Sequence, residues 1–301
     1  MRIVVALGGN ALSKRGETLT AAGQRASIRI AAKSLAGLLE AGHEVVITHG
    51  NGPQVGYLAL QGGVFPLDVL GAETDGMIGY VLQQELDNAY EPDVQYATLL
   101  TQIEVDSDDP AFHNPTKFIG PVYTEEDAAK LSAERGWSIG QDGSHFRRTV
   151  PSPRPKRILE LDVINLLLDQ RVIVICAGGG GIPVVQKPDG TMIGIEAVID
   201  KDHASGLLAR QVKADAFLML TDVEGVFENW GTPDQALIRQ ATPEMLAGMS
   251  FPAGSMGPKV EAASDFALAT GGFAAIGRLG DCLELVSGTT GTRVQLAKSE
   301  S

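Results

Sequence analysis

Three glycine-rich segments each follow a short, continuous run of aliphatic residues in this chain. The runs end at residues 5, 47 and 175, and the segments that follow are Ala6–Leu12, Thr48–Gln54 and Ala177–Pro183. Uninterrupted aliphatic runs are typical of strands in a parallel sheet, because helices bury such strands on both faces. Ligands of these sheets bind beyond the carboxyl ends of the strands, where glycine lets backbone N–H groups approach an anion. The pattern predicts an α/β fold with one site for a strongly charged ligand, for which phosphate is the obvious candidate.

Helical and strand-like patterns alternate along the 301 residues. Apolar residues at helical spacing predict helices over residues 21–41, 75–89, 158–169, 203–212 and 259–270. Short apolar runs predict further strands over residues 96–100, 217–220, 273–276 and 293–296. Alternation of this kind is typical of a mainly parallel sheet covered by helices on both faces.

One segment, from about residue 110 to residue 155, interrupts the alternation. Its apolar periodicity is weak, and it contains four glycines and the prolines Pro110, Pro115, Pro121, Pro151, Pro153 and Pro155. A loop of this length inside a compact domain is usually functional or forms a small subdomain. Two interpretations stay open, namely an excursion that closes over the site and a surface insertion without a catalytic role.

The composition argues against a nucleic-acid-binding, membrane or disulfide-rich protein. The formal net charge is −13, whereas a nucleic-acid-binding protein normally carries a basic surface, so we expect no nucleic-acid partner. No apolar run approaches the roughly 20 residues that span a bilayer, and the N-terminus lacks the layout of a signal peptide. The two cysteines, Cys176 and Cys282, do not make a disulfide framework. We therefore expect reduced thiols, a cytoplasmic location and no membrane partner.

The phosphate hypothesis does not depend on a familiar nucleotide-binding motif. The sequence contains no G-x-x-x-x-G-K-[ST], and Gly8-Gly9-Asn10 does not begin the G-x-G-x-x-G of dinucleotide-binding folds. The histidines show no spacing typical of zinc ligands. His49 lies at a predicted strand end, and a structural role is favoured over acid–base catalysis because the sequence offers it no evident carboxylate partner.

Three lysines stand beside glycine-rich or strand-end sequences, namely Lys117, Lys201 and Lys259. Each lysine alone is more simply explained as a solvated surface charge. Together they offer the charge neutralisation on which phosphoryl transfer depends. Lys259 follows a glycine-rich loop that opens a helix, where free N–H groups and the helix dipole favour anions.

Two aspartates allow more than one interpretation. Asp202 directly follows Lys201, and it either orients the neighbouring lysines or caps the N-terminus of a helix. Asp222 lies in a turn after a predicted strand, where it either contacts a ribose or shapes the turn. The residue types around Asp222 slightly favour the turn.

Eight segments, taken in order, resemble the carbamate kinases of the amino-acid kinase superfamily. They span essentially the whole chain and read VVALGGNAL (4–12), THGNGPQVG (48–56), PTKFIGP (115–121), VPSPRP (150–155), GGGGIPV (178–184), VIDKD (198–202), LTDVEGV (220–226) and GSMGPKVEA (254–262). The combination is highly specific, although each motif alone is not.

The resemblance implies a fold, a reaction and an assembly. The fold is a three-layer αβα sandwich with a mainly parallel open sheet, in one domain over residues 1–301. It comprises an acceptor lobe over about 1–170, with a protruding lid subdomain over about 110–155, and a nucleotide lobe over about 171–301. The reaction is ATP + carbamate ⇌ ADP + carbamoyl phosphate with Mg²⁺, favouring ATP formation during arginine or purine breakdown. The assembly is a homodimer.

The resemblance also assigns roles to individual residues. The groups that would hold carbamate and the transferring phosphoryl group are Gly8, Gly9, Asn10, Gly50, Asn51 and Gly52. Lys201 and Lys259 would neutralise the phosphates, Asp202 would orient them, and Lys117 would close over the small substrate. The residues near the nucleotide would be Thr221, Asp222, Gly257 and the same Lys201 and Lys259. No direct protein ligand to the metal is implied, because the nucleotide phosphates would carry the Mg²⁺.

Two positions show where this chain departs from its relatives. Ala6 stands where acetylglutamate, aspartate and uridylate kinases carry a lysine, but carbamate kinases lack that lysine too and supply charge from elsewhere, including the residue that matches Lys117. Phe118 stands where the family commonly has proline, which would alter the stiffness of the lid.

Two other functions are weighed against this one. The first is a sibling kinase that acts on another carboxylate or phosphate, and Ala6 together with the Lys117 segment argues against it. The second is a nucleotide-binding regulator without catalysis. Retention of the three lysines and Asp202 argues against the regulator, because a sensor needs no charge clamp for a transferring group.

Overall fold

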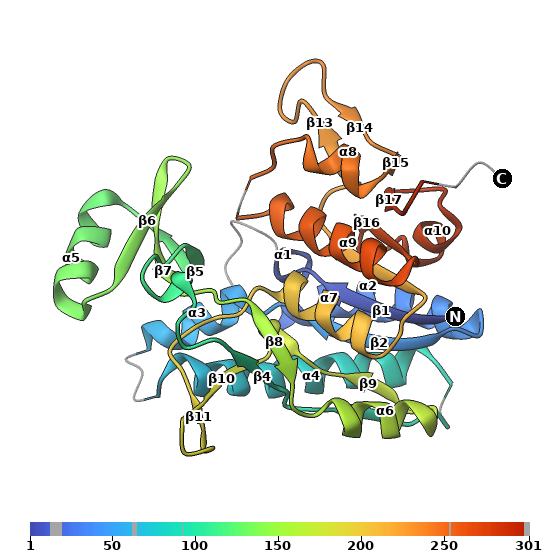
Figure 1. The fold of residues 1–301 in the computed structure, drawn as a ribbon, viewed down its shortest axis with the longest axis horizontal. Helices are drawn as coiled ribbons and strands as arrows, with labels where there is room; N and C mark the ends of the chain where they lie inside the picture. Colours follow the sequence, from blue (N-terminus) through green and yellow to red (C-terminus); the bar gives the residue numbers. More distant parts are fainter. Residues whose placement is uncertain (13–19, 62–64, 92, 253, 298–301) are drawn as a thin grey trace.

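The computed structural model describes residues 1–12, 20–61, 65–91, 93–252 and 254–297. Its centre is an eight-stranded sheet with the order β15-β17-β16-β12-β1-β2-β9-β3 (Figure 1). Neighbouring strands run parallel except for β16 and β17, so the predicted mainly parallel sheet is confirmed. The strands of this sheet are β1 (Arg2–Leu7), β2 (Glu44–His49), β3 (Tyr96–Thr98), β9 (Ile173–Ile175), β12 (Ala216–Thr221), β15 (Gln240–Ala241), β16 (Phe273–Arg278) and β17 (Thr292–Val294).

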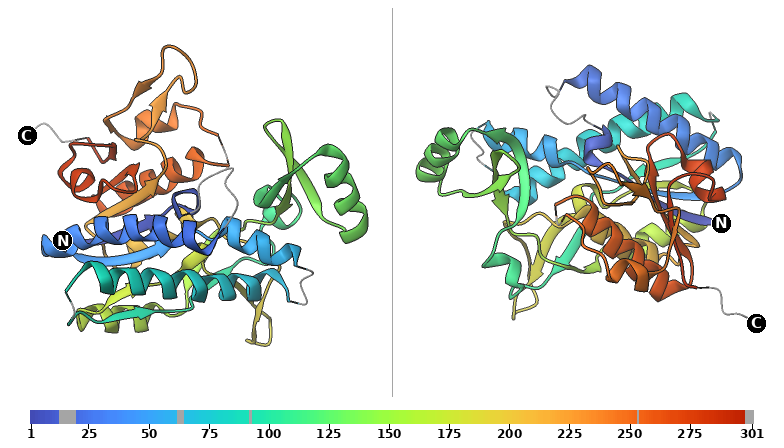
Figure 2. Two further views of the ribbon diagram at one scale, coloured as in Figure 1. Left: turned by 180° about the vertical axis from the view of Figure 1, so that it is seen from behind. Right: turned by 90° about the horizontal axis from the view of Figure 1, so that it is seen from above.

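Helices cover both faces of the sheet, which confirms the three-layer αβα sandwich (Figure 2). Along β1, Ile3 and Val5 point into one apolar core and Val4 points into the other. Burial on both faces is the physical reason why the strands read as continuous aliphatic runs. The first core contains α2 (Ala21–Glu40), α4 (Leu67–Ala89) and α10 (Cys282–Ser287), and the second contains α6 (Leu161–Asp169), α7 (Lys201–Gln211) and α9 (Met256–Thr270).

Three predicted helices begin at least three residues from their expected starts, and one of them, α9, begins at Met256 rather than at residue 259. Helix α4 begins at Leu67 rather than at residue 75, because Leu67 and Leu70 are buried and extend its packed face. Three glycines inside α4 hid this start, since each one costs about 1 kcal/mol of helix propensity relative to alanine. Helix α6 begins at Leu161 rather than at residue 158, because β8 (Pro155–Ile158) pairs with β4 (Gln102–Val105) in a second sheet.

The segment over residues 110–155 protrudes to one side of the sandwich (Figure 1). It contains a three-stranded antiparallel sheet in the order β5-β7-β6, formed by β5 (Lys117–Tyr123), β6 (Ser138–Asp142) and β7 (His145–Val150). Helix α5 (Glu125–Arg135) follows β5, with Thr124 as its N-cap and Gly136 in the left-handed conformation at its end. We call residues 117–150 the lid.

The lid is anchored to the sandwich where β5 crosses α3 (Gly52–Leu60). A Cβ atom on Gly56 would lie only 2.0 Å from the Cα atom of Gly120, so the two backbones touch directly. Gly120 has a φ of +72°, a conformation that L side chains rarely adopt. Beside this contact, Ile119 is buried in a small apolar cluster with Val55. The lid therefore meets the sandwich through a tight, apolar backbone crossing, to which polar contacts such as that of Arg148 with Glu196 are added.

No helix in the described ranges is both long enough and apolar enough to cross a membrane. Cys176 and Cys282 are buried free thiols, as the sequence predicts.

The remaining elements complete the structure around the sheet. The second sheet has the order β11-β10-β4-β8 and includes β10 (Ile182–Gln186) and β11 (Met192–Gly194). The other short elements are α1 (Gly9–Leu12), η1 (Pro110–Phe112), η2 (Gly178–Gly180), β13 (Phe227–Glu228), β14 (Ala236–Leu237) and α8 (Pro243–Ala247).

Candidate active site

The three glycine segments meet at one edge of the central sheet, because β1, β2 and β9 are neighbours in it. A Cβ atom on Gly50 would lie 2.7 Å from the backbone nitrogen of Gly9, so the first two loops touch along their backbones. A Cβ atom on Gly179 would lie 2.1 Å from the Asn51 amide nitrogen, which joins the third loop to the second. Only glycine fits at these contacts, and the structure brings the three predicted loops together.

Helix N-termini add backbone donors at this edge. Helix α3 begins at Gly52, and its N-cap Asn51 makes no side-chain capping bond in the described structure. Instead, the Asn51 side chain donates a hydrogen bond of 2.7 Å to the Thr74 hydroxyl. The first N–H groups of a helix have no partner within the helix, which makes the start of α3 favourable for an anion, although Pro53 in this turn has no N–H to donate. The side chain of Asn10, the remaining predicted member of this group, lies outside the described part of the chain.

A cluster of lysines and aspartates lies at the start of α7. The Asp202 carboxylate accepts hydrogen bonds from Lys201 Nζ at 2.6 Å and from Lys259 Nζ at 2.9 Å. The exposed fraction of these three side chains is 5%, 11% and 13% respectively. Lys259 stands in the first turn of α9, so Asp202 joins the N-terminal ends of two helices. The orienting interpretation of Asp202 therefore has a direct geometric basis.

The helix cap at this position is Asp200 rather than Asp202. Asp200 precedes α7, and its carboxylate accepts a hydrogen bond of 2.9 Å from the backbone N–H of Asp202. The same carboxylate forms an ion pair with Lys117 from the lid. Sequence reasoning did not single out Asp200, although an acidic residue just before a helix is a strong capping signal. It links the lid lysine to the helix that carries the other charges.

The charges in this cluster shift one another's pKa values. Burial alone would raise the pKa of Asp202, but the adjacent Lys201 and Lys259 ammonium groups hold it below its ordinary value. Burial opposes the ionisation of Asp200 as well, yet Lys117 above all keeps its pKa lowered. Burial lowers the pKa of Lys201, whereas the pKa of Lys259 is raised because the attraction of Asp202 exceeds the effect of burial. The lysines therefore favour the ionised form of both aspartates despite their burial.

The lid approaches the loop before α9 next to these charges. The Phe118 ring lies 3.8 Å from the position that a Cβ atom on Gly254 would occupy. The guanidinium of Arg147 lies 5.7 Å from the centre of the same ring and donates to the carbonyl oxygen of Gly120. Phe118 therefore fills the space between the lid sheet and the start of α9, directly beside Lys117.

The predicted nucleotide residues lie at the next strand of the sheet. Thr221 ends β12 and donates a hydrogen bond of 3.0 Å to the exposed Asp222 carboxylate. The N–H of Gly8 donates to the carbonyl oxygen of Leu220 at 2.8 Å, which places this strand end against the first glycine loop. Gly257 lies in the first turn of α9, near Lys259. The structure thus gathers these residues on the β12 and α9 side of the site.

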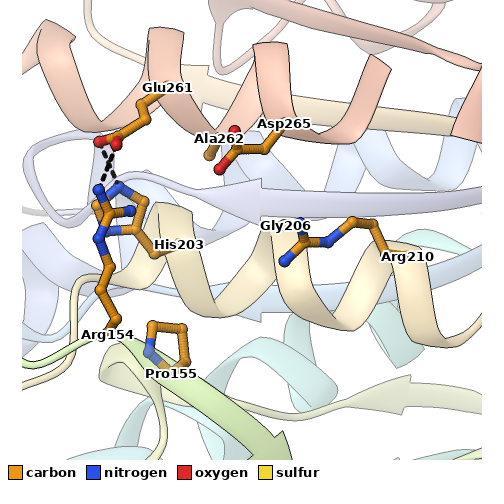
Figure 3. Close-up of a pocket in the computed structure, with 8 residues that line it drawn as sticks. All are labelled: Arg154, Pro155, His203, Gly206, Arg210, Glu261, Ala262 and Asp265. Atoms are coloured by element: carbon orange, nitrogen blue, oxygen red, sulfur yellow. Dashed lines mark hydrogen bonds and ion pairs between the residues drawn. The ribbon is translucent and has the colours of Figure 1, made fainter. Parts of the chain in front are cut away.

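A separate pocket of about 190 Å³ lies between the outer sides of α7 and α9 (Figure 3). Within it, Glu261 pairs with Arg154 and lies 3.0 Å from His203 Nε2. His203 and Glu261 each follow a site lysine by two positions, so they point away from the lysines on their helices. About half of the Arg154 and Glu261 side chains is exposed. This pocket is outside the lysine cluster. The contact of His203 with Glu261 joins the two helices, and Arg154, just before β8, pairs with the same carboxylate.

No group of three or more histidine, cysteine, aspartate or glutamate side chains is arranged to hold a metal ion in the described residues. The carboxylates of Asp200 and Asp202 are paired with lysines.

The sequence and structure can now be compared with known proteins. The amino acid kinase family model matches residues 1–272. The carbamate kinase of Haemophilus influenzae is 55% identical over 300 residues, which cover 98% of this chain and 96% of that protein. The chain belongs to the carbamate kinase family. A second family member, from Rhizobium meliloti, is 54% identical over 308 residues, covering all of this chain and 95% of that protein.

A solved structure of a family member agrees with the fold. Carbamate kinase from Giardia lamblia bound to AMP-PNP superimposes with a TM-score of 0.87 at 39% identity, covering 98% of both chains. Because the match spans the whole chain, the lid and both halves of the sheet are family features rather than additions peculiar to this protein.

Proposed function

We propose that this chain catalyses reversible phosphoryl transfer between ATP and carbamate, giving ADP and carbamoyl phosphate. The observation that carries the proposal is the convergence of Lys117, Lys201 and Lys259 on two aspartates beside the glycine loops. Such a site supplies positioning and charge neutralisation, which are what phosphoryl transfer requires. Membership in the carbamate kinase family supports this particular pair of substrates.

The glycine loops are proposed to hold carbamate and the phosphoryl group in transfer. Carbamate is a small planar anion, and backbone N–H groups can surround it where no side chains intervene. The N-terminus of α3, which begins at Gly52 within the second glycine loop, fits this role. The residues assigned to it are Gly8, Gly9, Asn10, Gly50, Asn51 and Gly52.

The lysines are proposed to neutralise charge as it develops in the transition state. Lys201 and Lys259 would contact the phosphate oxygens, and Asp202 keeps both ammonium groups in place through its two carboxylate oxygens. Lys117 would reach the carbamate side from the lid. Carbamate oxygen attacks the γ-phosphorus in line while the bond to the β-phosphate oxygen breaks, so no covalent enzyme intermediate is needed.

The nucleotide is proposed to bind beyond β12 and the start of α9, near Thr221, Asp222 and Gly257. Lys201 and Lys259 lie between this region and the glycine loops, where the phosphates would extend. Mg²⁺ would be carried by the phosphate oxygens and would neutralise part of their charge. The protein residues nearest to it are lysines and lysine-paired aspartates, which fit a metal ion that the nucleotide delivers.

Several coarser properties accompany this proposal. We propose a homodimer in the cytoplasm that works mainly in the direction of ATP formation. We also propose an acceptor lobe over about residues 1–170 with a lid over about 110–155, and a nucleotide lobe over about 171–301. Strand β9, from the second lobe, lies between β2 and β3 of the first, so the central sheet continues across this division.

The reaction is tested by incubating purified protein with ADP, Mg²⁺ and carbamoyl phosphate and following ATP formation. Lys259→Ala is measured alongside, and its kcat is expected to fall by about 100-fold or more because it removes charge stabilisation made mainly during transfer. Asp265→Asn, which changes an exposed carboxylate on the same helix, serves as the matched control.

ATP formation by the wild type that Lys259→Ala loses establishes both the reaction and the site. Absence of ATP from folded wild-type protein would refute the proposed substrates. A screen of other small carboxylates and phosphates with ATP would then test the sibling kinase, and nucleotide binding without any turnover would indicate the regulator.

A further inference from the structure

Asp75 is a buried carboxyl group that the proposed reaction does not use. It lies on α4, its exposed fraction is 2%, and neither carboxylate oxygen has a hydrogen-bond partner among the described residues. An unpartnered buried carboxyl group is costly, so one that lies beside a functional site requires an explanation.

The nearest neighbours of Asp75 are His49 and the third glycine segment. A Cβ atom on Gly178 would lie 2.6 Å from Asp75 Oδ1 and 2.5 Å from His49 Nε2, so both side chains press on the same side of one glycine. His49 is only 1% exposed, and its Nδ1 lies 3.4 Å from the carbonyl oxygen of Gly50. A hydrogen bond to that carbonyl requires Nδ1 to carry the proton, which leaves Nε2 without a proton and able to accept a hydrogen bond.

This pair supports several parts of the proposed acceptor site. Thr74, adjacent to Asp75, accepts the hydrogen bond from Asn51 in the second glycine loop. Gly180, two residues after Gly178, packs so closely on Ile199 that a Cβ atom would lie 2.2 Å from its carbonyl oxygen. Ile199 in turn leads directly into the charged cluster at the start of α7. A displacement of Gly178 would therefore also displace the second glycine loop and the lysine cluster at the start of α7.

Burial favours the neutral form of both side chains. Burial lowers the pKa of His49 to about 4, and nearby Lys201 acts in the same direction. Burial raises the pKa of Asp75 well above its ordinary value. The other titratable groups near the pair are Cys176 after β9 and Glu160 before α6. A protonated Asp75 can donate, and a neutral His49 can accept, so the two side chains are complementary.

We propose that Asp75 and His49 form a buried positioning pair that holds the acceptor-side loops, Gly50–Gly52 and Gly178–Gly180, in place for carbamate and carbamoyl phosphate. The inference rests on the proposed function. The pair would act through Gly178 and Gly50 rather than by direct contact with a substrate. It acts on the acceptor side because its contacts are with α4, β2 and η2, whereas the nucleotide residues lie beyond β12.

Asp75→Leu separates this role from simple packing. Leucine has a similar shape, and replacing an unpartnered buried carboxyl group by an apolar group is neutral or stabilising if only packing matters. If the pair positions the loops, the KM for carbamoyl phosphate rises or kcat falls by about tenfold or more, while the KM for ADP stays within about twofold. Asp75→Asn keeps a donor of the same shape, and we expect it to stay within about threefold of wild type in all three constants.

The control is Glu85→Gln on the same helix. Glu85 is also 2% exposed, but it is paired with Arg25 and Arg29 away from the glycine loops. This substitution is expected to lower thermal stability and to leave the KM for carbamoyl phosphate within about twofold of wild type.

The possible results are distinguishable. Wild-type kinetics in Asp75→Leu would overturn the positioning role, as would an equal loss toward both substrates. Loss confined to carbamoyl phosphate, with recovery in Asp75→Asn, would support it. If Asp75→Leu does not fold, His49→Leu is measured instead and judged by the same constants. Failure of wild type to form ATP would count against the proposed function itself.

Discussion

Two buried aspartates near the same edge of the sheet behave in opposite ways. Asp202 is held between Lys201 and Lys259, and its pKa is lowered despite burial. Asp75 has no partner among the described residues, and burial raises its pKa well above the ordinary value. The residue type is the same, so the difference comes entirely from the neighbours. The proposed site accordingly combines an ionised cluster for transfer with a neutral pair that supports the loops.

The largest effect on the difference between the two aspartates is expected when the charge of Asp202 is removed. Asp202→Asn would leave two buried ammonium groups side by side without their shared acceptor charge. We expect kcat to fall by about 100-fold, because both lysines lose their positions for transfer. Breaking buried ion pairs should also cost about 3 kcal/mol of unfolding free energy. Steady-state ATP formation and denaturant unfolding measure the two effects, and near-normal values in both would show that Asp202 does not organise the lysines.

Lys117→Ala tests whether the lid contributes to transfer rather than to nucleotide binding. Lys117 reaches Asp200 from the lid, and its side chain is 32% exposed. We expect kcat to fall by about tenfold or more while the dissociation constant for ADP stays within about twofold. ADP titration by calorimetry checks the second expectation. A large loss of ADP affinity would instead place Lys117 at the nucleotide.

The difference between the two aspartates also predicts how the free energy of unfolding depends on pH, and Asp75→Asn tests this prediction. A carboxyl group whose folded pKa is raised holds its proton in the folded state after the unfolded chain has released it. Wild-type stability therefore falls, relative to Asp75→Asn, as the pH rises above the unfolded value near 4, by up to about 1.4 kcal/mol per pH unit. The difference should stop growing once the pH passes the folded pKa.

Unfolding free energies of both proteins at several pH values between 4 and 8 measure this dependence. Parallel stability curves for wild type and Asp75→Asn would mean that Asp75 is ionised in the folded protein.

The smallest effect is expected where charges are exposed. Glu261 joins Arg154 and His203 behind the helix pair, and about half of its side chain is accessible. Glu261→Gln should change the unfolding free energy by less than about 1 kcal/mol, because water screens such pairs. Thermal unfolding in low and high salt measures the change. A larger, salt-independent loss would show that this cluster contributes far more than its exposure suggests.

Much of this arrangement was predictable from the sequence, for identifiable reasons. The three loops at one sheet edge could be predicted, because buried strands appear in the sequence as aliphatic runs and their loops as the glycines that follow. The lysines could be found because basic residues are few in an acidic chain. The ordered sheet of the lid was less evident, since its short strands are mostly half-exposed and carry little apolar periodicity.

Other parts of the site could not be found this way. Asp75 lies 26 residues from His49 and about a hundred from Gly178, and no local pattern marks the contact among the three. The sequence shows no carboxylate beside His49, because Asp75 is far from it along the chain. Helix α4 brings the Asp75 carboxyl group near His49 only in the folded protein. Asp202 shows the same limit, since its bond to Lys259 spans 57 positions.

The direct contact of Gly56 with Gly120 has a mechanical consequence. The lid packs on the sandwich where these two backbones touch, and a side chain on Gly56 would have no room there. Lys117 lies three residues from this contact, or about 10 Å along an extended strand. The crossing therefore acts as a spacer that sets where the strand presents the Lys117 ammonium group to Asp200.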